Sequence, residues 1–389
     1  ADIITITGDL NTNTISEEIR LVSNDNDSSK FSWLGGLFIF NNPSDRNNAI
    51  IFGTDSGLPN TPFQQNLFND IVRSGYALFG NVGFQLSNTL DVTVGIRYDS
   101  EKNDTEARRF YSNNGMEFEI PEFGFISESF DKNATFNALS PKIGFSYSSY
   151  DKNQLYYLSV SRGFRPGGIN SFEAELDRIQ FDPEFSWNYE AGFKSFAKNR
   201  KVQLSGSLFY IDWDNQQVLT VFGYVDNIGQ ARSAGAEFEL QAAPLKGVKL
   251  GVNLGYQDSK TVEYTSTDPD TGAIIDFANN RSIFAPEWNT GLFAQYDIIK
   301  NEKITTTIST DYSWQTATFF DLENELEQDA YGLLNARIAL KTKRFTLDFW
   351  ARNITDVTYF SFGFNNGDGR LSALYGLPAT VGSSLSLKF

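Results

Sequence analysis

The sequence predicts an all-β protein, an antiparallel transmembrane β-barrel, on the strength of three observations. Polar and apolar residues alternate along many segments, short and long connections alternate between them, and long apolar runs are absent. A membrane helix needs ~20 mostly apolar residues, whereas a membrane strand needs ~9–11 residues of which every second one is apolar. A mean hydropathy of -0.33 is therefore compatible with a barrel that crosses a membrane.

The alternation is clearest in the segment that begins at Leu90. One face of this predicted strand carries Leu90, Val92, Val94, Ile96 and Tyr98. The other face carries Asp91, Thr93, Gly95, Arg97 and Asp99. The segments 248–257 and 345–352 repeat the pattern, so each predicted strand has one apolar and one polar face.

About sixteen strands are predicted in this way. They lie near 2–8, 14–23, 31–41, 73–87, 90–103, 133–149, 154–164, 184–197, 201–221, 227–243, 248–263, 282–298, 303–318, 329–341, 344–358 and 377–389. Tight turns near 87–89, 150–153, 198–200, 244–247, 299–302 and 342–343 alternate with long loops at 42–72, 104–132, 165–183, 264–281 and 359–376, and with shorter ones at 222–226 and 319–328. Outer-membrane barrels have short periplasmic turns and long external loops, and a soluble sandwich has no reason to keep this rhythm.

Composition excludes several classes of function. The chain has no cysteine and no histidine, which removes disulfides, thiolate zinc sites, the Ser-His-Asp triad and the usual general base. We therefore expect no enzyme, no metal site and no cofactor. A net charge of -16 disfavours nucleic acid as a partner. An aromatic content of 15% fits the aromatic girdles of a membrane barrel.

Several segments resemble one known family. They are Ser159-Val-Ser-Arg-Gly-Phe-Arg-Pro-Gly-Gly168, Glu18-Ile-Arg-Leu21 with 31–38, Asn188-Tyr-Glu-Ala-Gly192, Asn227-Ile-Gly229 with Gly235-Ala-Glu237, Tyr331-Gly-Leu-Leu-Asn335, and Arg352-Asn-Ile-Thr-Asp356 with Tyr359. In this order they are similar to the barrel strands of TonB-dependent outer-membrane receptors. No single motif is specific, but the six together span residues 18–389.

The resemblance implies a Gram-negative outer-membrane protein that takes up a ferric siderophore or another scarce nutrient. Receptors of this family have a barrel of 22 strands, and a plug domain preceded by a TonB box. Nothing in residues 1–389 resembles that plug, so the whole chain is expected to be one barrel domain, truncated at its N-terminus. The implied partners are the lipid bilayer and lipopolysaccharide, the TonB complex acting through the missing plug, and the barrel-assembly machinery.

Three residues are singled out for roles. Arg162 and Arg165 flank a Gly-Phe step at the start of a long loop and are candidate contacts for an anionic ferric chelate. The alternative is that such an arginine pairs with a carboxylate in the barrel interior. Phe389 falls in phase on the apolar face and resembles the terminal aromatic that assembly machinery recognises.

Two other functions stay open at this point. A complete 16-strand general porin, a passive channel, fits the chain length, although no long loop shows clustered acidic residues that face a basic ladder. A barrel enzyme is disfavoured because histidine is absent. In the loop 319–328, four carboxylates offer a weak Ca²⁺ site, with a solvated acidic surface as the alternative.

Overall fold

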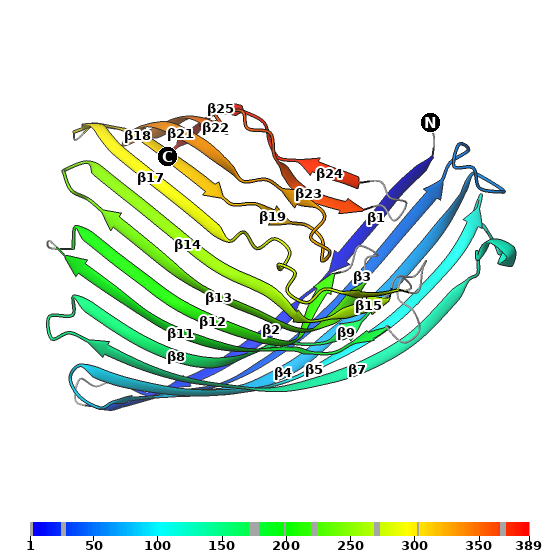
Figure 1. The fold of residues 1–389 in the computed structure, drawn as a ribbon, viewed down its shortest axis with the longest axis horizontal. Helices are drawn as coiled ribbons and strands as arrows, with labels where there is room; N and C mark the ends of the chain where they lie inside the picture. The colour runs from blue at the N-terminus through cyan, green and yellow to red at the C-terminus, as the bar shows by residue number, and fades with distance from the viewer. Residues whose placement is uncertain are drawn as a thin grey trace.

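The computed structural model describes residues 3–24, 29–170, 179–197, 200–219, 224–267, 273–301, 303–365 and 371–388. One large antiparallel sheet dominates these residues and is curved into a trough (Figure 1). Its strands are β1 (Ile4–Thr12), β2 (Ile15–Val22), β3 (Phe31–Phe52), β4 (Phe63–Gln85), β5 (Leu90–Asn113), β6 (Met116–Phe118), β7 (Glu128–Ser148), β8 (Gln154–Arg165), β11 (Glu184–Ala197), β12 (Val202–Leu219), β13 (Val225–Ala242), β14 (Val248–Glu263), β17 (Trp288–Lys300), β18 (Ile304–Gln315), β21 (Tyr331–Thr342), β22 (Phe345–Arg352) and β25 (Thr380–Leu387). The prediction of an all-β antiparallel sheet is confirmed.

Strand pairs such as β4 with β5, β7 with β8 and β11 with β12 form across tight turns that the sequence predicts. The turn between β7 and β8 is held by Asp151, which accepts hydrogen bonds from the Ser149 hydroxyl (2.5 Å) and from both nitrogens of Asn153 (3.1 and 2.9 Å). These bonds lower the pKa of the Asp151 carboxyl to about 2. Gly247, at φ +82°, serves the turn before β14.

The first two predicted strands occupy a single position in the sheet. β1 pairs with the second half of β3, from Ser44 to Phe52, and β2 pairs with the first half, from Leu34 to Asn41. β1 and β2 therefore lie end to end along one neighbour. In the part of the chain that the structure describes, neither this edge nor β25 at the other edge pairs with a further strand.

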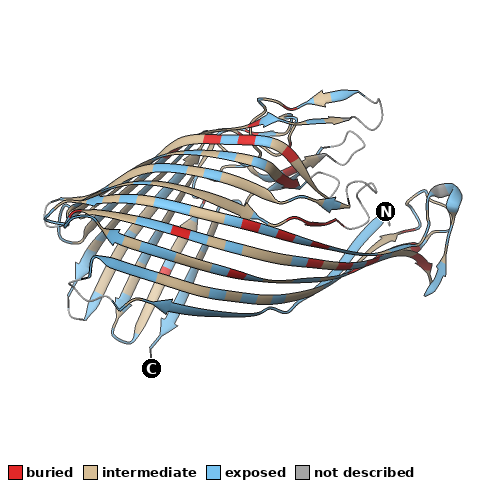
Figure 2. Ribbon diagram, turned by 90° about the horizontal axis from the view of Figure 1, so that it is seen from below, coloured by how far each residue is buried: buried red, intermediate tan, exposed pale blue. Residues whose placement is uncertain are grey.

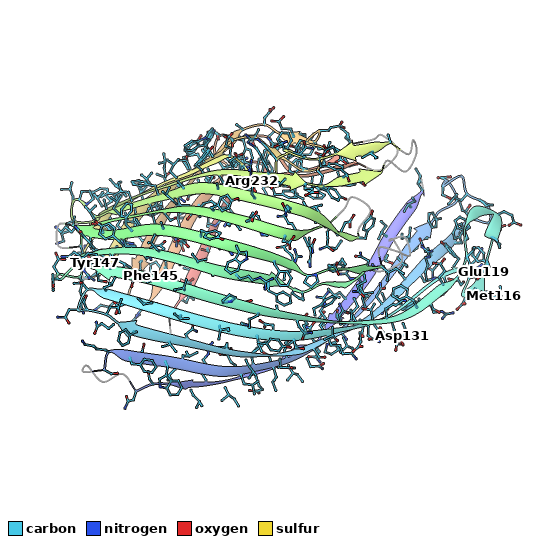
Figure 3. The ribbon with its side chains drawn as sticks, turned by 60° about the horizontal axis from the view of Figure 1, so that its bottom comes forward. Met116, Glu119, Asp131, Phe145, Tyr147 and Arg232 are labelled. Carbon is cyan, nitrogen blue, oxygen red and sulfur yellow. The ribbon has the colours of Figure 1, made fainter. Side chains whose placement is uncertain are left out.

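The prediction that residues 42–72 and 104–132 form loops is wrong, because most of these residues belong to strands. β3, β4, β5 and β7 contain 22, 23, 24 and 21 residues. A membrane strand needs only ~9–11 residues, so about half of each strand extends beyond the bilayer. Figure 3 places Phe145 and Tyr147 near the turn end of the sheet and Met116 and Glu119 at the far tip.

The four other long connections contain short two-stranded sheets. These are β9 (Gly168–Ile169) with β10 (Gln180–Phe181), β15 (Thr265–Thr267) with β16 (Ile274–Asp276), β19 (Thr318–Phe319) with β20 (Glu327–Gln328), and β23 (Phe360–Asn365) with β24 (Leu371–Tyr375). All four lie toward the end of the sheet opposite the tight turns (Figure 1). The described residues contain one 3-10 turn, η1 (Pro121–Phe123), and no helix that could cross a membrane.

Two buried clusters lie on the trough side of the long strands. Ile169 of β9 packs with Ala134 and Phe136 of β7, which shows that this face of β7 is the inner one. Phe63 is 2% exposed and contacts four aromatic rings, those of Phe52, Tyr111, Phe118 and Phe125. Elsewhere intermediate and exposed residues alternate along the strands (Figure 2), as expected for a sheet one strand thick.

Candidate functional site

The outer face of the sheet carries two rows of exposed aromatic side chains. The row toward the loops includes Tyr76, Tyr98, Trp187, Tyr189, Tyr210 and Trp288. The row toward the turns includes Phe31, Phe84, Tyr147, Tyr156 and Tyr296. Between the rows the outer positions are aliphatic, such as Val94 (51% exposed) and Ile96 (53%). This banded surface is the lipid-facing belt of a membrane barrel, and it places the long loops outside the cell.

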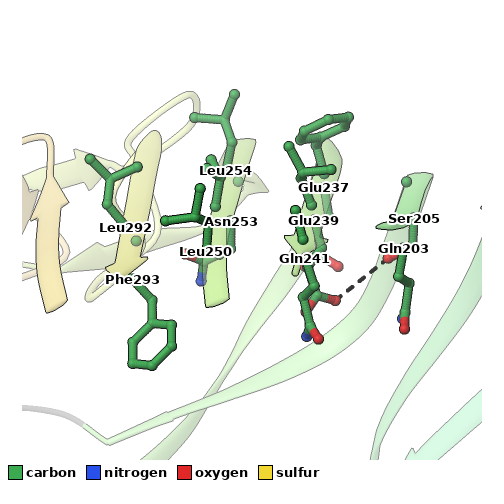
Figure 4. A pocket seen from close by; sticks show the side chains of 18 of the residues that line it. Gln203, Ser205, Glu237, Glu239, Gln241, Leu250, Asn253, Leu254, Leu292 and Phe293 are labelled. Carbon is green, nitrogen blue, oxygen red and sulfur yellow. Dashed lines mark hydrogen bonds between the residues drawn. The ribbon is translucent and has the colours of Figure 1, made fainter. Parts of the chain in front are cut away.

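The trough wall opposite this belt is polar and charged. Between β8 and β18 it is hollowed into a cavity of about 1040 Å³, whose lining includes Glu190, Glu237 and Glu239. In Figure 4, the Ser205 hydroxyl bonds Glu239 (3.5 Å), while Leu292 and Phe293 point in opposite directions from adjacent positions of β17. The Tyr157 hydroxyl donates to Glu190. Such a wall suits a water-filled or plug-filled interior and not a dry core.

Charged groups on the inner wall are paired within the sheet where strands meet. Arg337 of β21 contacts Asp348 of β22 through two nitrogens, at 3.0 and 2.6 Å, and Asp348 is only 7% exposed. Arg97 pairs with Asp99 at 2.7 Å and lies over the rings of Phe38 and Phe79. Buried carboxylates are therefore compensated by charge, as their desolvation requires.

Three side-chain amides fasten the loop 165–183 to β12 and β13. The Gln217 amide donates to the backbone oxygens of Pro166 (2.8 Å) and Asp182 (3.0 Å). Asn170 both donates to and accepts from the backbone of Val225, at 2.8 Å each. Asn227 does the same with the backbone of Asp182, at 2.9 and 2.7 Å. Because Asn170 and Gln217 are only 5% and 8% exposed, their bonds fix the described part of the loop over the trough.

A second clamp joins the segment after β16 to the loop between β19 and β20. Asn324 accepts from the backbone nitrogen of Arg281 (2.7 Å) and donates to its oxygen (3.0 Å). Asp321, 9% exposed, accepts from the backbone nitrogens of Glu325 and Leu326 at 3.0 Å. Desolvation raises the pKa of the neighbouring Glu323 carboxyl, and the Asp321 and Glu325 charges raise it further.

The acidic loop 319–328 therefore uses Asp321 as an internal cap. Among the described residues, no three His, Cys, Asp or Glu side chains converge on a point where a metal ion would bind. The Ca²⁺ hypothesis thus gains no support from the position of Asp321. Glu323, Glu325 and Glu327 are exposed, which matches the solvated acidic surface that was the alternative.

The motif Arg352-Asn-Ile-Thr-Asp356 forms a third clamp. Asn353 is 4% exposed and donates to the backbone oxygens of Val357 (2.9 Å) and Leu377 (3.1 Å). Its own oxygen accepts from the Val357 nitrogen at 2.9 Å. Asp356 accepts from the Ala379 nitrogen at 2.8 Å. This motif closes the last loop onto the sheet and has a structural role.

The structure separates Arg162 and Arg165, the two candidate ligand contacts. Both belong to β8, and residues three positions apart on a strand point to opposite faces. The Arg162 guanidinium lies 4.0 Å from the centroid of the Phe185 ring and donates to the Leu139 oxygen at 3.1 Å. Arg165 is exposed, stands on the trough side, and makes no ion pair with any residue that the structure describes. Phe389 lies outside the described residues.

Sequence reasoning missed the amides Asn170, Gln217 and Asn324, and it read Asn227 and Asn353 only as parts of motifs. A signal was available, because Asn353 precedes residues rich in turn formers and Asn227 follows an aspartate after a loop. Their backbone partners come from distant segments, which spacing alone does not reveal.

Comparison with known proteins agrees with this geometry. The family model described as "TonB dependent receptor-like, beta-barrel" matches residues 5–354, and the chain belongs to that family. As a member of it, the chain is a β-barrel of the Gram-negative outer membrane. The comparisons support the receptor family and not the porin alternative.

Three solved structures share the fold. One is the ferric yersiniabactin uptake receptor FyuA from Yersinia pestis, 21% identical, with a TM-score of 0.80 over 100% of this chain and 56% of that one. Another is the siderophore receptor PiuA from Acinetobacter baumannii, 14% identical, with a TM-score of 0.74 over 97% of this chain and 56% of that one. The third is the copper transporter OprC, 11% identical, with a TM-score of 0.71 over 99% of this chain and 58% of that one. The chain thus spans little more than half the length of these proteins.

Proposed function

We propose that the chain is the barrel wall and external loop region of an outer-membrane receptor that takes up a ferric siderophore by active transport. The observation that carries this proposal is a family barrel whose polar trough is overlaid by loops fastened with side-chain amides. A passive channel has no need to fix its loops in one arrangement, whereas a binding site depends on such preorganisation. Binding and transport, without catalysis, account for these features.

Within this proposal, Arg165 contacts the anionic part of the ligand. It is the exposed member of the predicted pair and lies on the trough side of β8, at the base of the clamped loop. Arg162 is engaged by Leu139 and Phe185 and supports the loop base instead. FyuA is a ferric yersiniabactin uptake receptor and PiuA a siderophore receptor, which favours an iron chelate over a free metal ion.

The rest of the receptor completes the barrel and fills it. Unpaired strand edges in a bilayer leave backbone groups without partners, so we infer that further strands of the same protein join β25 to the β1–β2 edge. The exposed Glu237, together with Glu190 and Glu239, makes the cavity wall acidic, so that basic residues of a plug can bind there. Coupling to TonB would pass through that plug, and the outer belt would contact lipid and lipopolysaccharide. Residues 1–389 then form one barrel domain, assembled by the outer-membrane machinery with Phe389 as its signal.

Uptake of radioactive iron by cells with and without the full-length gene tests the proposal. Uptake should depend on the gene and on a siderophore, and should stop when an ionophore collapses the proton gradient. Replacing Arg165 with Ala should weaken ligand binding, while Arg165→Lys should retain more of it. Gene-dependent uptake that persists without the gradient would instead indicate a passive channel.

A further inference from the structure

Four phenylalanines from three external segments form a surface that we call the aromatic patch: Phe284, Phe320, Phe362 and Phe364. The Phe284 and Phe362 rings are stacked, with centroids 5.9 Å apart and planes at 8°. Phe320 lies 5.5 and 6.3 Å from these two rings, and Phe364 lies 5.8 Å from Phe362. Phe284 is 48% exposed and Phe362 is 39% exposed, so the patch presents ring surface to solvent.

The patch is held open by its surroundings and is not a collapsed core. Phe284 has φ +55°, a strained conformation that a bulky residue rarely adopts. Its backbone nitrogen donates to the Phe319 oxygen at 2.9 Å, and the Asn324 clamp ties the same two segments together. Gly363 leaves room for the Phe320 ring, because a Cβ there would stand 2.8 Å from Cδ2. Packing alone therefore does not explain why the rings stay exposed.

The segments that carry the patch are acidic on balance in the residues that the structure describes. The loop 319–328 carries Asp321, Glu323, Glu325 and Glu327 and no basic residue. The only basic residue of the segment 279–287 is Arg281, which is neutralised by Glu287 at 2.8 Å. Aromatic faces attract cations, and the negative potential of the surrounding carboxylates also favours a cation. An anionic group would be repelled at this place.

We propose that the aromatic patch binds a cationic, ring-bearing part of the transported ligand, so that the receptor prefers a chelate with an amine or other positive group beside a flat ring. This inference rests on the proposed function and names the ligand chemistry of its external loops. Arg165 lies at the end of β8, at the base of a different loop, so a single ligand with separated charges can satisfy both contacts. The patch then acts by selecting among chelates, not by binding the metal.

Two iron(II) complexes of opposite charge test this preference. The probes are the iron(II) tris-complexes of bipyridine, a dication, and of bathophenanthroline disulfonate, a tetra-anion. Binding to the full-length receptor in detergent is measured by equilibrium dialysis and absorbance. We expect the dication to bind more tightly than the tetra-anion. The combined change Phe284→Leu and Phe362→Leu, which keeps apolar surface but removes the rings, should weaken dication binding about fivefold.

Two further variants make the test specific. Changing Glu323, Glu325 and Glu327 together to Gln should weaken dication binding at low salt and have little effect in about 1 M salt, where charges are screened within ~3 Å. Phe68→Leu is the control, because Phe68 is 41% exposed but lies on β4, outside the patch.

Tighter binding of the tetra-anion, or dication binding that the two Phe→Leu changes leave intact, would overturn the inference. Iron uptake distinguishes this failure from failure of the proposed function. If wild-type cells show siderophore-dependent uptake but the patch variants do not change binding, only the inference about the patch fails. Absence of gene-dependent uptake removes the proposed function, whatever the dialysis shows.

Discussion

Polar and apolar residues alternate in both halves of β7, but the apolar residues lie on opposite faces of the sheet in the two halves. From Leu139 to Ser148, the outer positions are apolar and the trough positions are Ser140, Lys142, Gly144, Ser146 and Ser148. From Glu128 to Ala138, the outer positions are Ser, Asp, Asn and Thr, while Phe130, Ala134 and Phe136 face the trough. The apolar face therefore changes sides within one continuous strand.

This inversion marks the point at which the surrounding solvent changes. In the lower half the outer face meets lipid, so apolar residues point outward. In the upper half the outer face meets water, and apolar residues are buried on the inner side as in a soluble sheet. On β5 the same boundary falls between Tyr98 and Ser100, beyond which the outer face reads Ser100, Lys102, Asp104, Glu106 and Arg108.

The largest effect is expected in the upper half, at its buried inner face. Phe63→Ala should destabilise the tip of the long strands by about 3–5 kcal/mol, since a fully buried ring is lost from an aromatic cluster. Hydrogen exchange of the amides in 63–72 measures the change. Phe68→Ala, on the outer face of the same strand, should have a much smaller effect. Equal losses for the two variants would refute the inversion.

A somewhat smaller effect is expected on the outer face of the lower half. Val94→Arg places a charge among lipid tails and should cost about 2–4 kcal/mol, read from urea-dependent folding into lipid vesicles. Glu106→Arg, on the same face of β5 but above the boundary, should change stability by less than ~0.5 kcal/mol. If both variants fold equally well, Val94 does not face lipid.

The clamps over the upper trough come next in size. Gln217→Leu removes two hydrogen bonds and leaves the oxygens of Pro166 and Asp182 without this donor, at a cost of about 1–3 kcal/mol. Faster hydrogen exchange in 165–170 and 179–183 should report the loosened loop, with Gln216→Leu as the neighbouring control. Unchanged exchange would show that the amide does not hold the loop.

The smallest effect concerns the turn at the lower end of β7 and β8. The folded-state pKa of Asp151, about 2, lies below its ordinary value of 3.8. Its stabilising contribution is therefore complete above the ordinary value and is lost as pH falls through about 2. Ser149→Ala removes the largest cause and should move the pKa toward 3.8, as followed by NMR of the carboxyl. A pKa that does not move would mean that the Ser149 hydroxyl is not its partner.

The sequence predicted strands accurately where the outer face of a strand segment meets a single solvent along its length. Leu90–Tyr98 and Val248–Tyr256 keep one phase from turn to membrane edge, so their alternation identified strand and outer face together. The prediction failed above the boundary, because charged outer residues such as Asp104 and Glu106 resemble a polar loop when the apolar phase is no longer in step. The inner partners that restore the pattern, such as Tyr111 and Phe63, are recognisable only once the neighbouring strands are paired.

The candidate site was predictable only in its location. The motif around Arg162 and Arg165 pointed to the loop that the side-chain amides clamp, but strand alternation separates the two side chains, and Leu139 and Phe185 engage the first. The clamps and the aromatic patch join segments about 20 to 80 residues apart, as in the contacts of Phe284 with Phe320 and Phe362. Such partners follow from the fold and not from local spacing.

A lipid-quenching scan along β7 tests the central claim most directly. The chain contains no cysteine, so single cysteines can be placed from 128 to 148 and labelled with a fluorophore in the full-length receptor. Quenchers attached to lipid tails should reduce fluorescence at 139, 143, 145 and 147. They should leave it unchanged at the outer positions 131, 133, 135 and 137 and at the trough positions 142 and 146. Quenching that continues through 131–137 would show that lipid covers the upper half, and the inversion would then not mark the membrane boundary.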